Sequence, residues 1–406
     1  MTTHREDPDV SSRTRLRQRI LAKPRRSVLA LAAVGAITVA VMPAAGAAPE
    51  ADENPIVEYG PVPSSLPIGG VCEVEYHDGK LWIEQYLSSE ITSYDLKTGE
   101  YESFPTPQPL SVPGGMDIDD KGNYWMPGVT NNSLIRFSTD TGKYKQFPLP
   151  WNNVFSTTLG KTPLNVGHVL SNDVAIGPDG AVWFTAGGLN SIGRFDPESE
   201  TFSRYKVPGE IGGQVHSLFG IIKPGPGRTV VFNMPQMNKV GTIDVDTKEI
   251  KQYTMPTPMS WPTGIRTARD GTIWVGEGLG MKLAQVFPET GKVKEYPLLG
   301  VDGLLTSVLD SLEIGSIGNP LPQLGPVVEG RDGNIYAMLA FASPALLGNQ
   351  VLKFNPKTKE ATMWPTPSPA SYPCDINPDE NGTLWFGELV AQKFGRIDVP
   401  APSGTE

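Results

Sequence analysis

Polar turn residues and short apolar runs alternate along most of the chain and recur as a repeat. A turn, often Asp-Gly, precedes a run that usually carries one aromatic residue, as in residues 78–83 and 179–184. Related segments bring the total to seven copies, the others being residues 121–126, 225–232, 270–275, 332–337 and 381–386. Short runs rich in β-branched and aromatic residues, bounded by Gly, Asp and Pro, are typical of strands. The pattern therefore predicts a β repeat protein.

Two further strand-like patterns follow each copy. The first is clearest at residues 191–197 and 394–398, and the second at residues 101–107 and 362–367. Each unit then contains four short antiparallel strands, which is the blade of a β-propeller. A parallel β-helix is the alternative, but its coils are shorter than this period of roughly 45 residues. We predict an all-β fold, a seven-bladed β-propeller over residues 55–400 with a tail at 401–406.

The two ends of the repeat region are complementary. The last copy stops after its third strand, at residues 397–399, and residues 55–60 form a strand-like segment that precedes the first copy. Pairing of these two segments in one blade would close the ring. Closure removes the exposed strand edges that an open sheet presents to other chains.

The N-terminal segment has the layout of an export signal. Arg25 and Arg26 directly precede an apolar stretch at residues 29–41, and residues 45–47 fit a small-x-small cleavage site. Paired arginines in this position indicate a twin-arginine signal. A membrane anchor is the alternative, but about 13 apolar residues are too few to span the bilayer. We expect a signal peptide at residues 1–47, a linker at 48–54 and an exported, extracytoplasmic protein with no membrane span after cleavage.

Charge narrows the range of partners. The whole chain carries a net charge of -10, and loss of residues 1–47 leaves 26 Lys/Arg against 41 Asp/Glu, a net charge of -15. Such a surface repels nucleic acid and anionic membranes. We expect a monomer that binds a small-molecule or peptide ligand.

The only two cysteines fall at equivalent positions of the repeat. The residues that begin the innermost strands are Cys72, Gly114, Asn172, Phe219, Thr263, Gly325 and Cys374. Cys72 and Cys374 belong to the first and last blades, which are neighbours in a closed ring. In an exported protein this placement predicts a disulfide. Two buried thiols or a metal pair are the alternatives, because facing inner strands can hold the two cysteines too far apart.

One face of the ring collects the sequence features that suggest binding. The three long insertions, residues 151–171, 298–324 and 339–349, all lie at the end of the channel where the inner strands begin. Residues 302–313 have helical apolar spacing and could form a cap. Elaboration on one face usually marks a binding site, although such loops can also merely plug a channel.

Candidate chemistry on this face is limited. His168 and His216 precede inner strands and could act as a base, whereas His77 belongs to a turn on the opposite face. Glu277 and Glu388 end the second strands of their blades and could ligate Mg2+ or Ca2+, or act as acid and base; hydrogen bonding of these carboxylates to a loop is the alternative. Residues at or beside the inner-strand starts form a second candidate set at the channel mouth: Asn172, Asp173, Glu73 and Thr263.

The repeated segments at residues 270–277, 381–388 and 191–197 resemble the streptogramin B lyase (virginiamycin B lyase) family. The resemblance extends over residues 55–399 and implies a seven-bladed propeller. In that family a histidine removes a proton beside a carbonyl, while Mg2+ held partly by glutamate stabilises the enolate, which opens a cyclic depsipeptide ester by elimination. Glu388 and Glu277 fall on the glutamate-bearing strand ends. The positions expected for the histidines carry other residues, namely Thr263, Gly325 and Cys374.

Two functions therefore remain open. The first is a metal-assisted lyase or lactone-opening enzyme, with Glu388 and Glu277 as metal ligands and His216 as the base, His168 being the other candidate. The second is a non-catalytic propeller that binds a ligand or partner over the looped face. A sugar-lactone hydrolase or redox propeller is a more distant alternative.

Overall fold

The computed structural model describes residues 54–107, 114–151, 169, 171–209, 220–298, 322–341, 349–369 and 371–401. The predicted signal peptide, most of the linker and the expected helix at residues 302–313 lie outside the described residues, as does most of each long insertion. No helix in the described part of the chain is long and apolar enough to cross a membrane.

The described strands form seven four-stranded antiparallel sheets, each of which is one blade. Blade 1 contains β2 (Val71–His77), β3 (Lys80–Gln85), β4 (Glu90–Asp95) and β5 (Tyr101–Pro105). Blade 2 contains β6 (Asp117–Ile118), β7 (Asn123–Gly128), β8 (Ser133–Ser138) and β9 (Lys143–Pro148). Blade 3 contains β10 (Val174–Ile176), β11 (Val182–Ala186), the 3-10 turn η1 (Gly187–Leu189), β12 (Ser191–Asp196) and β13 (Thr201–Lys206).

The other four blades repeat this order. Blade 4 contains β14 (Ile222–Pro224), β15 (Thr229–Met234), η2 (Pro235–Met237), β16 (Lys239–Asp244) and β17 (Ile250–Thr254). Blade 5 contains β18 (Pro262–Thr267), β19 (Ile273–Glu277), β20 (Lys282–Phe287) and β21 (Lys292–Pro297). Blade 6 contains β22 (Pro322–Glu329), β23 (Ile335–Phe341), β24 (Gln350–Phe354) and β25 (Ala361–Pro365). Blade 7 contains β26 (Pro373–Pro378), β27 (Leu384–Glu388), β28 (Lys393–Ile397) and β1 (Ile56–Tyr59).

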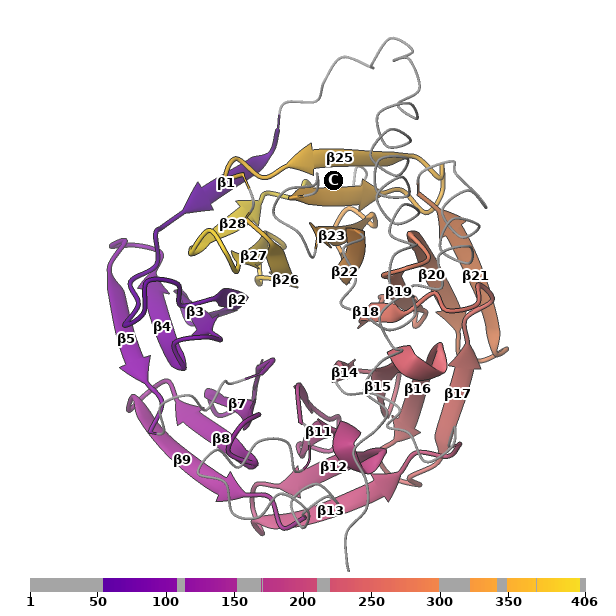
Figure 1. The fold of residues 1–406 in the computed structure, drawn as a ribbon, viewed down its shortest axis with the longest axis horizontal. Helices are drawn as coiled ribbons and strands as arrows, with labels where there is room; N and C mark the ends of the chain where they lie inside the picture. Colours follow the sequence, from indigo (N-terminus) through magenta and orange to yellow (C-terminus); the bar gives the residue numbers. More distant parts are fainter. Residues whose placement is uncertain are drawn as a thin grey trace, which may run out of the picture. The chain divides into compact units, whose positions relative to one another are not determined.

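Blade 7 is built from both ends of the repeat region. β1 pairs antiparallel to β28, with Ile56 opposite Ile397 and Tyr59 opposite Phe394. In Figure 1 the indigo β1 lies against the yellow β28, where the sequence colours meet around the ring. The N-terminal strand thus supplies the outermost strand that the last repeat lacks.

The polar turn between the first two strands of a blade explains the repeated sequence signature. In blade 3 the Asp179 carboxylate accepts a hydrogen bond of 2.9 Å from the indole Nε1 of Trp183. Gly180 follows with φ +71°, a conformation that glycine adopts without steric cost. The same pairing recurs between Asp119 and Trp125 at 2.8 Å. The turn residues therefore anchor the tryptophans that pack between blades.

Hydrophobic packing joins each blade to the next. Seven buried clusters lie between successive blades, and the one that joins blade 7 to blade 1 contains Trp385, Phe394, Val74 and Ile83. Burial of each large apolar side chain contributes about 1.5–3 kcal/mol. The core is therefore distributed around the ring, and the innermost strands are left to line a central channel.

Candidate functional site at the channel mouth

A cavity of about 300 Å3 occupies the channel, and residues of all seven blades line it. The four predicted channel-mouth residues, Glu73, Asn172, Asp173 and Thr263, are all among its lining residues. Thr263 is held in place because its hydroxyl donates to the carbonyl oxygen of Gly276 at 3.0 Å. Six of the seven predicted inner-strand starts therefore converge on one site, and the seventh, Phe219, lies outside the described residues.

Cys72 and Cys374 form a disulfide, which confirms the predicted bond. Their Cα atoms are 4.9 Å apart, and 302 residues separate them in the sequence. Both residues line the cavity. The bond ties the inner strand of blade 1 to that of blade 7, the two blades that close the ring.

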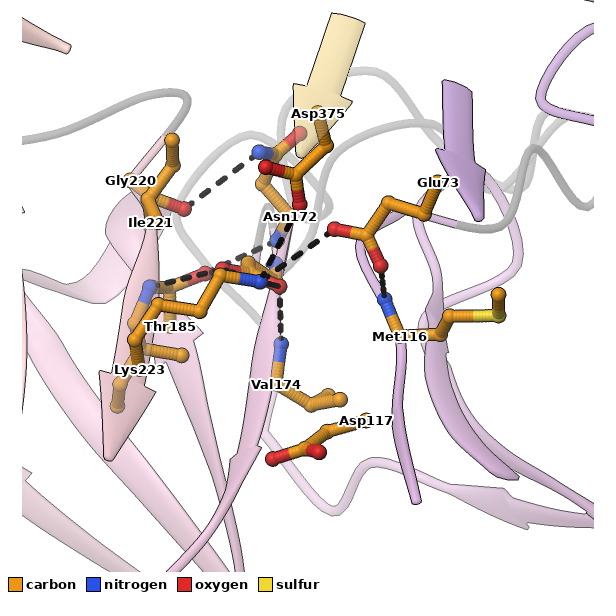
Figure 2. A network of polar contacts seen from close by, with 12 residues as sticks. Glu73, Met116, Asp117, Asn172, Val174, Thr185, Gly220, Ile221, Lys223 and Asp375 are labelled. Carbon is orange, nitrogen blue, oxygen red and sulfur yellow. Dashed lines mark hydrogen bonds and ion pairs between the residues drawn. The ribbon is translucent and has the colours of Figure 1, made fainter. Parts of the chain in front are cut away.

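A buried lysine occupies the centre of an acidic layer in this cavity. The Nζ of Lys223 lies 3.4 Å from Glu73 and 3.3 Å from Asp173, and 3.8 Å from Asp375. Figure 2 shows Glu73, Lys223 and Asp375 pointing toward one another from three different inner strands. Lys223 is only 6% exposed. One ammonium group thus cross-links blades 1, 3, 4 and 7.

The carboxylates of this layer also complete the backbone hydrogen bonding of the inner strands. An innermost strand has one edge without a neighbouring strand, and buried N–H groups there require another acceptor. Asp173 accepts from the backbone N–H of Ile222 in the next blade at 2.9 Å. Glu73 accepts from the backbone N–H of Met116 in the same way. These two acids therefore have a structural role in joining adjacent blades.

Burial and the lysine set the protonation of the layer. Burial raises the pKa of Asp173 to about 6, against the opposing attraction of Lys223. Burial raises the pKa of Glu73 well above its usual value, and the neighbouring acids add to that rise. The pKa of Asp375 is lowered, because Lys223 and Arg266 outweigh the effect of its burial.

Lys223 itself remains protonated. Burial alone would lower its pKa, but Asp173, Glu73 and Asp375 together raise it. The ammonium group therefore acts as a fixed positive charge and does not take a proton from a substrate at neutral pH.

Glu84 brings a further acid into the cavity, and the sequence analysis did not identify it. It lies on β3, lines the cavity and is 1% exposed. Neither oxygen of its carboxyl has a well-formed hydrogen bond within the described structure. Burial raises its pKa well above the usual value, and the backbone N–H of Glu73 only partly opposes that rise. Glu84 is thus a buried acid that faces the cavity, and the backbone N–H of Glu73 is too poorly aligned to satisfy its carboxyl.

Glu277 and Glu388, the predicted metal ligands, lie elsewhere. Both side chains are completely buried, and neither is among the residues that line the cavity. Burial, followed by the nearby carboxylate of Glu295, raises the pKa of Glu277 to about 9. Burial, followed by Glu58, raises the pKa of Glu388 to about 8. Both groups are therefore mainly protonated at neutral pH.

The surroundings of these two glutamates are the same in blades 5 and 7. Beside Glu277, Lys282 pairs with Glu295 at 3.2 Å and donates to the hydroxyl of Thr257 at 2.9 Å. Beside Glu388, the corresponding contacts are Lys393 with Glu58 at 2.9 Å and Lys393 with the hydroxyl of Ser368 at 2.7 Å. The arrangement connects each blade to the loop that enters it.

Blade 1 has a neutral amide at the same position. Gln85 pairs with the first residue of the next strand, as Glu277 and Glu388 do. Its Nε2 donates to the hydroxyl of Thr92 at 2.7 Å. The blade therefore accepts a neutral side chain at this position, although the carboxyl oxygens of Glu277 and Glu388, unlike the amide of Gln85, have no well-formed hydrogen bond among the described residues. Their role as metal ligands stays a prediction that this geometry does not favour.

The described residues contain no group of three or more His, Cys, Asp or Glu side chains arranged to hold a metal ion. The enclosed carboxyls of Glu277 and Glu388 have no well-formed hydrogen bond among the described residues, and each has one neighbouring carboxylate, Glu295 and Glu58 respectively. Two carboxyl groups are fewer oxygen ligands than Mg2+ or Ca2+ usually takes from a protein site, so the described residues alone do not make up a complete site. In the acidic layer, the Lys223 ammonium already occupies the position between the carboxylates.

The histidines do not complete this site in the described structure. His168 and His216, the predicted bases, lie outside the described residues. His77 ends β2 and lines a shallow hollow with Tyr76, Asp379 and Glu380, next to the turns that connect the inner strands to the second strands. This position agrees with the prediction that His77 is a turn residue away from the channel mouth.

The residues that the sequence analysis missed had weak signals. Lys223 stands between apolar residues in a short inner strand, which is an unusual position for a lysine in a β core. Glu84 stands one residue before the position that corresponds to Glu277 and Glu388, and successive residues of a strand face opposite sides. The alternation of side chains along the strand therefore places Glu84 on a different face from the other two.

Comparisons with known proteins agree with the repeat pattern. The model of the virginiamycin B lyase family matches residues 168–304. No curated protein matches the sequence.

Solved structures show the same fold. Selenomethionine-substituted virginiamycin B lyase from Staphylococcus aureus is 21% identical with a TM-score of 0.66, over 85% of this chain and 99% of that chain. A catalytically inactive variant of that enzyme with quinupristin is 20% identical with a TM-score of 0.65, over the same shares. The extracellular domain of a one-component system from B. thetaiotaomicron is 12% identical with a TM-score of 0.57, over 85% of this chain and 40% of that chain. The chain is therefore a seven-bladed β-propeller that resembles the virginiamycin B lyase family, in sequence over residues 168–304 and in fold around the ring.

Proposed function

We propose that this protein is an exported propeller that binds a small molecule at the mouth of its central channel. The observation that carries the proposal is the cavity of about 300 Å3 that all seven blades line, together with the Glu84 carboxyl in its wall, which has no well-formed hydrogen bond among the described residues. Ligand sites are typically concave, of about 300–1,000 Å3, with a few convergent polar groups. The rest of the cavity wall includes Tyr86, Tyr372 and Leu389, all partly exposed.

A fragment screen with a blocked variant tests this proposal. Asn172 lines the cavity, and its side-chain amide makes only a long contact of 3.5 Å to the carbonyl oxygen of Gly220. We expect Asn172→Phe to fill the cavity and to abolish binding of fragments that bind the wild type. Thr362→Phe, at an exposed position of the outer strand β25, is the control and should bind normally. The proposal is wrong if the wild type binds no fragment, or if the blocked variant binds every hit unchanged.

Two observations support export. Arg25 and Arg26 precede an apolar stretch in a signal-like arrangement, and the disulfide between Cys72 and Cys374 is typical of oxidising compartments. Replacing both arginines by lysine keeps the charge but should retain a twin-arginine substrate in the cytoplasm. Secretion of that variant at the wild-type level, measured by fractionation, would contradict this route.

A metal-assisted lyase is the second candidate, and the family match over residues 168–304 favours it. His216, with His168 as the other candidate, would take the proton beside a carbonyl, and a divalent cation would stabilise the negative charge that develops. Calorimetric titration of metal-stripped protein with Mg2+ and Ca2+ tests the metal. Binding abolished by Glu388→Gln would support the lyase, whereas the buried position of Glu388 leads us to expect no such effect.

A further inference from the structure

Glu84 and the residues around it indicate which class of ligand the cavity takes. The cavity wall contains four acids, Glu73, Glu84, Asp173 and Asp375, but only two cations, Lys223 and Arg266. The cations are already engaged. Lys223 contacts three of the acids, and the Nη2 of Arg266 donates to the Oδ1 of Asn377 at 2.6 Å.

Glu84 is therefore the acid of the cavity wall that neither of these two cations contacts. Glu73 and Asp173 accept backbone hydrogen bonds from the next blades and contact Lys223, whereas neither oxygen of Glu84 has a well-formed hydrogen bond among the described residues. A buried polar group without a well-formed hydrogen bond destabilises the free protein, so a ligand that supplies the bond gains affinity there. A protonated amine can supply the missing partner, and such a cationic donor is favoured because it also offsets the excess of acid.

Aromatic and aliphatic side chains limit the choice of cation. Tyr86 follows Glu84 closely on the chain, and Tyr372 and Leu389 line the same cavity from blade 7. Aromatic faces attract organic ammonium groups, and aliphatic walls cover an apolar body. A divalent metal ion would instead require several ionised oxygen ligands around one point, and the described residues contain no such group.

We propose, building on the small-molecule site proposed above, that the channel mouth binds a protonated amine with an apolar body, and that Glu84 pairs with its ammonium group. The binding is coupled to protons. In the free protein, burial raises the pKa of Glu84 well above its usual value. An ammonium ion beside it favours the ionised form, so binding releases a proton and the affinity rises with pH while Glu84 remains protonated in the free state.

The surrounding charges shape this coupling. The titratable and charged groups that share the cavity with Glu84 are Glu73, Asp173, Asp375, Lys223, Arg266, Tyr86 and Tyr372. Asp173, with a pKa of about 6, is mainly ionised at pH 7.5, and Asp375 is ionised as well. Lys223 and Arg266 offset the negative charges of these two aspartates. The ammonium group of the ligand then offsets the charge of ionised Glu84.

Calorimetric titration with 2-phenylethylamine and with its uncharged analogue 2-phenylethanol tests the proposal. We expect the full-length mature protein to bind the amine at pH 7.5, and the alcohol roughly 10- to 100-fold more weakly, the worth of one charge-assisted hydrogen bond. Glu84→Gln should weaken amine binding by a similar factor and leave alcohol binding unchanged. Titrations in phosphate and in Tris, whose heats of ionisation differ, should show net release of protons on amine binding by the wild type and a smaller release by Glu84→Gln.

Glu277→Gln is the matched control, because Glu277 is also buried and also has a raised pKa but does not line the cavity. It should leave amine binding and proton release unchanged. Equal affinity for amine and alcohol, both lost in Asn172→Phe, would overturn the amine assignment and leave the small-molecule site intact. Binding of neither compound, together with a fragment screen without hits, would overturn both. Mg2+ or Ca2+ binding that Glu84→Gln abolishes, without amine binding, would overturn the amine in favour of a metal.

Discussion

Removal of the buried ammonium in the channel should be among the most damaging single substitutions in this protein. Lys223→Met keeps the length and apolar body of the side chain but removes the charge. It leaves Asp173 and Asp375, which are 2% and 5% exposed, without the cation that lies 3.3 and 3.8 Å from their carboxylates. Loss of one partner from a buried ion pair costs about 3–5 kcal/mol. We expect a loss of this size in the free energy of unfolding at pH 8.

The loss should depend on pH in a defined direction. Without Lys223, the folded-state pKa of Asp173 rises above its present value of about 6, whereas its unfolded-state value stays near 3.8. A carboxyl whose pKa is raised by folding lowers stability as pH increases from the unfolded value to the folded value. The variant should therefore lose most stability relative to wild type above pH 6 and recover part of it at pH 5, where Asp173 is protonated.

Urea unfolding at pH 5 and pH 8, followed by tryptophan fluorescence, measures both effects. Lys393→Met is the matched control, because Lys393 also pairs with a carboxylate, Glu58, but its side chain is 32% exposed. That control should lose about 1 kcal/mol or less, as is usual for partly exposed pairs. The double variant Lys223→Met with Asp173→Asn should be more stable than Lys223→Met alone. If Lys223→Met costs no more than the control at pH 8, or costs the same at both pH values, the assignment of the ion cluster is wrong.

Three further measurements test other parts of the structure. Serine at both Cys72 and Cys374 should lower the free energy of unfolding by about 5 kcal/mol, because the bond restricts a very long loop of the unfolded chain; an unchanged urea midpoint under non-reducing conditions would contradict this. Glu277→Gln should become more stable than wild type as the pH rises from 5 to 9. The wild-type carboxyl stays protonated in the folded protein up to its pKa of about 9 but ionises in the unfolded chain, so the free energy of unfolding of wild type falls by up to about 1.4 kcal/mol per pH unit in this range, whereas glutamine does not titrate. If the melting temperatures of wild type and Glu277→Gln change in parallel with pH, Glu277 has no raised pKa and this prediction is wrong. Calorimetric titration with Mg2+ should give the same result for wild type and Glu388→Gln, and a difference would return Glu388 to the role of metal ligand.

The architecture can be predicted from the amino-acid sequence alone, because each blade is encoded locally. The turn and the aromatic strand recur seven times, and a side chain such as Trp183 is recognisable from its neighbours in the chain. The repeat register also placed Cys72 and Cys374 at equivalent positions of neighbouring blades, which led to the disulfide. A periodic fold repeats its local rules, so counting and alignment are sufficient to predict it.

Which side chains face the channel depends on the tertiary structure. Neighbouring residues of a strand point to opposite faces of the sheet. Glu84 stands one residue before the position that Glu277 and Glu388 occupy in their own blades, so its side chain lies on the other face. The inner strands add irregularities that the sequence does not show. Register shifts interrupt β2 after Val71 and β26 after Pro373, close to the acids of the channel.

The ion cluster itself depends on distant parts of the chain. Lys223 meets Glu73, 150 positions earlier in the sequence, and also Asp375, because the closed ring brings the inner strands of blades 1, 4 and 7 to one axis. No local sequence pattern indicates that these three residues lie close together in space. Composition and repeats therefore determine how many blades form, whereas burial and the geometry of the closed ring determine which of their acids are paired, protonated or left to bind a ligand.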